Sequence, residues 1–370
     1  MKIKNLLLST LLLCSSTTIL CGQSIGLKDI VKGKFLVGAA INMNQVENKD
    51  AKAIELLDKH FNAIVAENCM KGETVHPEED RYDFKQADEF VRFGERHGMT
   101  MTGHCLIWHS QPPKWFFTDQ EGKLVSAKVM KQRMKEHIYT VVKRYKGKLK
   151  GWDVVNEAIE DDGSWRQSPF YKILGKEYIP LAFQYAHEAD PEIELYYNDY
   201  NMGNEKKRNT VVALIKDLKR RGLRIDAVGM QGHMGMDYPD IKEFEKSILA
   251  YAGTGVKVMI TEWEMSALPT VSKSANISDK VAYEKQANPY TDGLPSAVSN
   301  EWNNRMGAFF NLFLKHADVI TRVTVWGITD KDSWKNDYPI EGRTDYPLLF
   351  DRSYQPKAFV KTLINNYKNQ

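Results

Sequence analysis

The chain repeats one pattern along most of its length: a short apolar run, a polar residue or turn, and then a stretch with helical spacing. Apolar runs rich in β-branched and aromatic residues are typical of buried strands, whereas apolar residues three and four apart are typical of amphipathic helices. Strict alternation of the two predicts a parallel sheet with right-handed crossovers. Eight such runs occur, at residues 35–41, 62–67, 99–108, 149–157, 193–198, 225–233, 256–262 and 320–328.

The number of repeats selects among the parallel α/β folds. Eight strand–helix units in roughly 350 residues fit a closed barrel better than an open doubly wound sheet. No glycine-rich phosphate-binding loop follows the first run, Phe35–Ile41, and no internal sequence repeat or Pro/Ser linker occurs after residue 25. We therefore expect an α/β protein with a single (β/α)8 TIM barrel.

Residues 1–22 have the pattern of a Sec signal peptide, with basic residues at the start, an apolar stretch from Leu6 to Leu13 and small residues before Gln23. Cleavage near Gly22 would leave residues 23–370 as the barrel domain, in the periplasm or outside the cell. Lipidation at Cys21 is less favoured, because the bulky Leu20 precedes it. No later segment is apolar enough to cross a membrane.

Charge excludes a polyanion as the partner. The chain has 51 basic and 48 acidic residues, a net charge of +3, and no basic run with interleaved aromatic residues. Nucleic acid is therefore not an expected ligand. Two short basic clusters, 206–208 and 219–221, flank an apolar helical stretch, and we interpret both as solvated helix faces.

The cysteines exclude a disulfide-built scaffold. Two of the four, Cys14 and Cys21, lie in the expected leader, which leaves Cys69 and Cys105. Each lies in or just after an apolar run, so we expect buried free thiols, although an oxidising compartment would permit a bridge. Two cysteines are also too few for a cysteine zinc site.

Polar residues crowd the carboxyl ends of the predicted strands, where a barrel strand should be apolar. One such residue is readily explained as a helix cap or a hydrogen-bonded core histidine. Seven strands doing so together indicate an active site, because barrel enzymes build theirs at this face. The residues are Glu67, Asn68, His104, Trp108, His109, Asn156, Glu157, Asn198, Asp199, Gln231, His233, Glu262, Glu264, Trp326 and Asp330.

Two of these residues are carboxylates expected to converge. Side-chain alternation places Glu157 on the face of Val155, and Glu262 on the face of Ile260, so both should point into the top of the barrel. Buried together they would repel, which favours one protonated and one ionised carboxyl group. Glycosidic bond cleavage needs such a pair, about 5 to 5.5 Å apart in a retaining enzyme. Flat faces on which sugar rings stack are offered by Trp108, Trp326 and Trp334.

The segments that hold these residues resemble glycoside hydrolase family 10, whose members are endo-β-1,4-xylanases on a TIM barrel. The similarity covers most of the mature chain in the right order. The segments WDVVNE and ITE, at strand ends, are the most specific. The matching segments are AENCMK (66–71), GHCLIWHSQPPKW (103–115), WDVVNEAI (152–159), GMQGHM (229–234), ITEWEM (260–265), VTVWGITDKDSW (323–334) and GRTDYPLLFD (342–351).

The resemblance implies a retaining mechanism with a covalent glycosyl-enzyme intermediate, with Glu262 as nucleophile and Glu157 as acid/base. It also implies that Asn156 hydrogen-bonds the 2-hydroxyl of the sugar under attack. By the same resemblance, Glu67, Asn68 and Lys71 bind the next sugar on the non-reducing side. The two subsites around the nucleophile would be lined by His104, Trp108, Asn156, Gln231, His233, Trp326 and Trp334.

One departure from the family pattern lies beside the nucleophile. Family members usually carry Leu-Asp after it, whereas this chain has Trp263-Glu264. We expect His233 to bridge Glu262 and Glu264, one on each ring nitrogen, because their strands are neighbours in a barrel. The long segment 266–299 that follows should shape distal subsites.

Three alternatives stay open. A metal hydrolase could use His104, His109 and His233, but the five-residue spacing of the first two puts them on opposite strand faces. A protein that only binds polysaccharide would have lost a catalytic carboxylate. A β-1,4-glucanase, or a mixed xylanase/glucanase, would use the same carboxylates. The favoured interpretation is a monomeric endo-1,4-β-xylanase with residues 23–370 as the catalytic domain, xylan or xylo-oligosaccharides as substrate, and neither metal nor cofactor.

Overall fold

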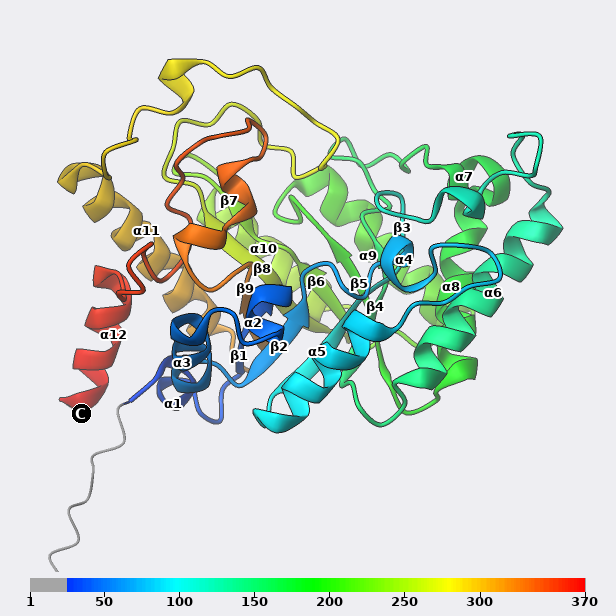
Figure 1. The fold of residues 1–370 in the computed structure, drawn as a ribbon, viewed down its shortest axis with the longest axis horizontal. Coiled ribbons are helices and arrows are strands. Elements are labelled where there is room, and N and C mark those ends of the chain that lie inside the picture. Colours follow the sequence, from blue (N-terminus) through cyan, green and yellow to red (C-terminus); the bar gives the residue numbers. More distant parts are fainter. Residues whose placement is uncertain (1–24, 370) are drawn as a thin grey trace, which may run out of the picture.

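The computed structural model describes residues 25–369, so the expected signal peptide at residues 1–22 lies outside them. Helices ring a central parallel sheet, and the long segments that follow several strands gather at one end of it (Figure 1). Within residues 25–369, no helix is both long enough and apolar enough to traverse a bilayer.

The sheet is a closed barrel, as the alternating pattern predicts. Its strands pair in parallel in the order β6-β5-β4-β3-β2-β1-β9-β8, and β6 pairs with β8 to close the ring. The sixth run is broken at Gly232, which has φ +83°, and resumes as β7 against β8. The strands are β1 (Leu36–Ile41), β2 (Ala63–Ala66), β3 (Thr100–Trp108), β4 (Gly151–Asn156), β5 (Glu194–Asp199), β6 (Ala227–Met230), β7 (His233–Met234), β8 (Lys257–Met265) and β9 (Ile320–Val325).

Several helices begin where a polar side chain satisfies a free backbone N–H group. Ser126 caps α6, Asn204 caps α9 and Asp240 caps α10. Among the helices of residues 25–369, three have only four residues. The helices are α1 (Leu27–Ile30), α2 (Met43–Val46), α3 (Ala51–His60), α4 (Gly72–Val75), α5 (Lys85–Arg96), α6 (Ala127–Arg144), α7 (Pro169–Leu174), α8 (Tyr178–Ala189), α9 (Glu205–Arg220), α10 (Ile241–Ala252), α11 (Ser296–Lys315) and α12 (Ala358–Lys368).

The core between barrel and helices also orients the site. Trp263 of β8 is 1% exposed, and its ring packs against Phe310 and Phe313 of α11 and Phe359 of α12. Because side chains alternate along a strand, this outward tryptophan directs its neighbours Glu262 and Glu264 to the opposite face, inside the barrel.

One expectation about the surface is wrong. Lys207 and Arg208 are not on a solvated helix face, since they are 0% and 8% exposed. Lys207 lies 3.0 Å from both Asp199 and Asp161 and 3.9 Å from the centre of the Tyr200 ring. A buried lysine is tolerated here because its charge is paired. The expectation for Cys69 and Cys105 is confirmed, as both are buried free thiols.

Candidate active site

The carboxyl ends of the strands converge on one cavity. Of the twelve residues that the sequence assigns to the site, eleven line this cavity. The other, Gln231, donates from Nε2 to Oε1 of Glu157 at 2.9 Å. The eleven are Glu67, Asn68, Lys71, His104, Trp108, Asn156, Glu157, His233, Glu262, Trp326 and Trp334.

The alternation of side chains along β4 does not explain how Glu157 reaches the cavity. It lies just beyond β4 with φ +56°, and the register of β4 shifts between Asp153 and Val155. As a result, Glu157 and its neighbour Asn156 both approach Gln231, at 2.9 and 3.2 Å. The expected convergence is correct, but the turn at Glu157 produces it rather than a two-residue period.

The Glu157 carboxyl group is buried, at 3% exposed, and both of its oxygens accept hydrogen bonds. Trp108 donates from Nε1 at 2.8 Å, opposite Gln231. Burial raises the pKa of Glu157, and the nearby Asp199 adds to the rise. Such a group holds a proton above the pH at which an ordinary glutamate loses it.

The pKa of Glu262 is shifted in the opposite direction. Asn198 donates from Nδ2 to Oε1 at 2.8 Å, and His233 Nε2 lies 3.0 Å from Oε2. Burial alone would raise the pKa of Glu262, but the hydrogen bond and charge of His233 outweigh it and the pKa lies below its ordinary value. Glu262 is therefore the carboxylate of the pair.

The expected bridge through His233 is confirmed. His233 Nδ1 lies 2.7 Å from Glu264, and Nε2 lies 3.0 Å from Glu262. Since carboxylates only accept, both ring nitrogens carry protons and the imidazole is charged. Burial lowers the pKa of His233, but the Glu264 charge and the two hydrogen bonds raise it to about 9. Glu264 also accepts from Trp334 Nε1 at 2.7 Å.

Asn198 connects the two halves of the site. Its Nδ2 lies 3.1 Å from the side chain of Asn156 as well as 2.8 Å from Glu262. The hydroxyl of Thr261 donates to its Oδ1 at 2.6 Å, which fixes the orientation of the amide. Continuous hydrogen bonds thus run from Glu262 through Asn198, Asn156 and Gln231 to Glu157.

A second cluster of polar side chains lies on the side of the cavity nearest β2 and β3. Lys71 is 6% exposed and donates from Nζ to Asn68 and Gln111, both at 2.8 Å, with its ammonium 4.8 Å from the centre of the Trp108 ring. Burial raises the pKa of Glu67 despite the Lys71 charge. These groups present hydrogen-bond donors and acceptors to the cavity. His104 is held by Asp153 at 2.9 Å.

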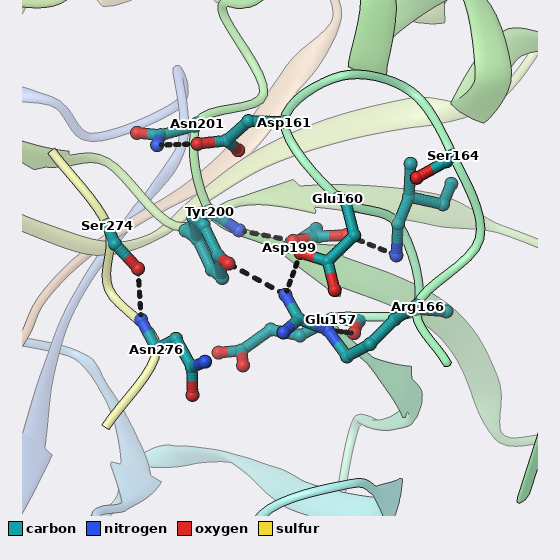
Figure 2. A network of polar contacts seen from close by, with 12 residues as sticks. Glu157, Glu160, Asp161, Ser164, Arg166, Asp199, Tyr200, Asn201, Ser274 and Asn276 are labelled. Atoms are coloured by element: carbon teal, nitrogen blue, oxygen red, sulfur yellow. Dashed lines mark hydrogen bonds and ion pairs between the residues drawn. The ribbon is translucent and has the colours of Figure 1, made fainter. Parts of the chain in front are cut away.

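Sequence reasoning gave no role to several residues of the site. It placed Asn198 among the polar strand-end residues without assigning it a function, and it missed Gln111, which lies within the matching segment 103–115. Ala275 and Ile277 also line the cavity, although the segment 266–299 was expected only at distal subsites. This segment is fixed to Asn201 through the Lys273 carbonyl at 2.8 Å, and it passes beside Tyr200 and Glu157 (Figure 2).

The arrangement is suited to acid and nucleophilic catalysis by two carboxyl groups. The pKa of Glu157 is raised and that of Glu262 is lowered, so between the two pKa values Glu157 holds a proton while Glu262 is ionised. Within residues 25–369, no group of three or more His, Cys, Asp or Glu side chains is arranged to hold a metal ion.

Comparison with known proteins agrees with this geometry. The model of glycosyl hydrolase family 10 matches residues 26–366. The chain belongs to glycosyl hydrolase family 10. A relative, endo-1,4-beta-xylanase A of Xylanibacter ruminicola, is 52% identical over 344 residues, which cover 92% of this chain and 93% of the relative.

Solved structures of xylanases share the fold. A GH10 endoxylanase from a sugarcane soil metagenome has a TM-score of 0.88 at 44% identity, covering 92% of this chain and 100% of that chain. The intracellular xylanase of Thermoanaerobacterium saccharolyticum, solved as a mutant with xylotetraose, has a TM-score of 0.80 at 33% identity, covering 92% and 98%. The single (β/α)8 barrel of this family 10 chain is therefore shared with both.

Proposed function

We propose that the protein is a retaining endo-1,4-β-xylanase that cleaves β-1,4-xylosidic linkages within xylan. The observation that carries the proposal is the pair Glu157 and Glu262, buried in one cavity with pKa values displaced in opposite directions. The names of the relatives indicate xylan as the substrate class.

In the first step, Glu262 attacks the anomeric carbon while Glu157 transfers its proton to the glycosidic oxygen, so the C–O bond to the departing chain breaks as the glycosyl ester forms. In the second step, Glu157, now ionised, removes a proton from water, and the water oxygen displaces Glu262 from the anomeric carbon. Two inversions give net retention. The separation of the two carboxyl groups, about 5 to 5.5 Å, remains a prediction.

The supporting residues follow from their contacts. Asn156, held by Asn198 and Gln231, is the group we assign to the 2-hydroxyl of the sugar under attack. Glu67, Asn68 and Lys71 bind the neighbouring sugar on the non-reducing side. The remaining cavity residues His104, Trp108, His233, Trp326 and Trp334 surround the two rings at the point of cleavage.

We also propose that residues 1–22 are removed on export and that the mature protein is a monomer in the periplasm or outside the cell, with lipidation at Cys21 less favoured. The apolar stretch Leu6–Leu13 supports export. The N-terminal sequence and light-scattering mass of protein recovered after expression would test both statements. An uncleaved N-terminus, or a dimer mass, would contradict them.

The substrate and the stereochemistry are testable together. Rates on xylohexaose and cellohexaose, with the anomer of the first product followed by ¹H NMR, should show preference for the xylo-oligosaccharide and an initial β-anomer. Comparable or faster cleavage of cellohexaose would favour a β-1,4-glucanase. An initial α-anomer would show inversion and contradict the assigned roles.

A further inference from the structure

Arg166 lies beneath the turn that carries Glu157. It is 7% exposed, and its Nε donates to the backbone carbonyl of Glu157 at 2.8 Å. Its own backbone N–H donates to the Ala158 carbonyl at 2.9 Å, and Ile159 pairs with Trp165 in an antiparallel bridge. The loop after β4 therefore folds back so that a guanidinium group reaches the peptide next to the carboxyl group (Figure 2).

The backbone at Glu157 needs such support. Its φ of +56° is in the left-handed region, which is strained for a residue with a side chain. Its N–H donates to the Asn198 carbonyl at 2.9 Å, while its carbonyl accepts from Arg166 Nε at 2.8 Å. The hydrogen bond from Arg166 therefore fixes the carbonyl of Glu157, as the Asn198 carbonyl fixes its N–H.

The other end of the guanidinium is itself anchored. Arg166 Nη2 donates to the Tyr200 hydroxyl at 2.7 Å and lies 3.2 Å from Glu160 Oε2. The Tyr200 N–H donates to Asp199, which also accepts from the buried Lys207 at 3.0 Å. Arg166 thus joins the Glu157 peptide to the hydrogen-bonded end of β5, and its planar guanidinium group can make both bonds at once.

We propose that Arg166 is a positioning residue for the proton-transfer steps. It acts through the Glu157 backbone, and it keeps the carboxyl group directed at the glycosidic oxygen without itself touching the substrate. The proposal rests on the proposed role of Glu157 as acid/base. Small displacements of a catalytic group are enough to matter, because a misplacement of about 1 Å can cost roughly 100-fold in rate.

The dependence of rate on the leaving group isolates this role. A poor leaving group needs protonation, whereas 2,4-dinitrophenol leaves with little assistance. For Arg166→Met we expect kcat/KM to fall about 100-fold on xylotetraose and less than about 3-fold on 2,4-dinitrophenyl β-xylobioside. Added azide, which needs no base, should raise kcat of this variant on the dinitrophenyl substrate. Equal losses on the two substrates would overturn the proposal.

Two further variants separate positioning from folding. Arg208→Met is a matched control, because Arg208 is 8% exposed and bonds to Ser247 and Glu243 between α9 and α10. It should lower the melting temperature without any dependence on the leaving group. Arg166→Lys keeps the charge but lacks the fork, and it should show the same leaving-group dependence as Arg166→Met in weaker form, which keeps the test available if the methionine variant does not fold.

The role of Glu157 is tested in parallel. Glu157→Gln should show a larger leaving-group dependence than Arg166→Met, and Arg166→Met should add less than about 3-fold in the Glu157→Gln background. If Glu157→Gln retains its rate on xylotetraose, the proposed function fails. If Glu157→Gln behaves as expected but Arg166→Met lowers the rates of both substrates alike, only the role of Arg166 fails.

Discussion

His233 contacts Glu262 through Nε2 at 3.0 Å while its Nδ1 lies 2.7 Å from Glu264. The proposed nucleophile, Glu262, therefore contacts a charged imidazole. That imidazole in turn contacts a second carboxylate, Glu264, which lies two residues further along β8. The pKa of Glu262 depends on Glu264 through this histidine.

Glu264→Gln should move the acidic limb of the kcat/KM profile to higher pH. Removing the Glu264 charge lowers the pKa of His233 from about 9, so His233 stabilises ionised Glu262 less and the pKa of Glu262 rises. The measurement is a pH–rate profile on an aryl xylobioside. Glu264→Asp, which keeps the charge, is the control and should shift less. An acidic limb identical to that of the wild type would show that the bridge does not tune Glu262.

The same histidine predicts how stability varies with pH. A group whose folded pKa is about 9, above its ordinary 6.5, stabilises the fold fully below pH 6.5, and this contribution is lost as the pH rises through 9. His233→Gln should therefore lower the free energy of unfolding more at pH 6 than at pH 10. Urea titrations at both values measure the difference, and a gap that is independent of pH would contradict it.

Glu157→Ala and Glu262→Ala should fail differently on a substrate with a good leaving group. The first should form the glycosyl-enzyme and then stall, because the general base is absent, and azide should rescue it to give a β-glycosyl azide. The second lacks the nucleophile and should give no product of retained configuration. Product stereochemistry by ¹H NMR distinguishes them. Rescue of both to the same anomer would contradict the roles.

Trp263→Ala should destabilise the fold by about 3–5 kcal/mol, as expected for a large buried aromatic side chain. Its ring fills the space between β8 and the two helices α11 and α12. Trp263→Leu, with the residue usual in the family, is the control and should lose less. Urea unfolding measures both, and a loss below about 1 kcal/mol for the alanine variant would show that this packing matters little.

Catalysis should be unchanged in a strong chelator. The chemistry proposed for this site uses two carboxyl groups, and two of the three histidines considered for a metal site are held by carboxylates, His104 by Asp153 and His233 by Glu262 and Glu264. Rates on xylan after dialysis against EDTA should equal the untreated rates. Inactivation by EDTA that zinc reverses would restore the metal-hydrolase alternative.

Much of the fold and site could be predicted because the signals are local. A period of two, a run of apolar residues and a strand end are all visible within about ten residues, and they place Glu262, Glu264 and His233 correctly. The resemblance to family 10 adds roles that spacing alone does not give, such as that of Asn156.

What could not be predicted depends on contacts distant in sequence or on exceptions to regular geometry. Lys207 is buried because Asp161, 46 residues earlier, and Asp199 neutralise it. Glu157 leaves the strand period at a positive φ. The segment holding Ala275 and Ile277 has no regular pattern, and its place over the cavity is set by Asn201 and by Tyr338, whose hydroxyl donates to the Ser274 carbonyl at 3.0 Å.

The two cysteines of the described chain provide a built-in reporter of dynamics. Cys69 and Cys105 are 5% and 3% exposed, and Cys105 lies on β3 between His104 and Trp108 of the cavity. Burial raises the pKa of the Cys69 thiol to about 12 and that of Cys105 well above its usual value, so neither reacts in the closed barrel. The rate at which a thiol reagent labels these two cysteines therefore measures how often the part of the barrel around β2 and β3 opens to water.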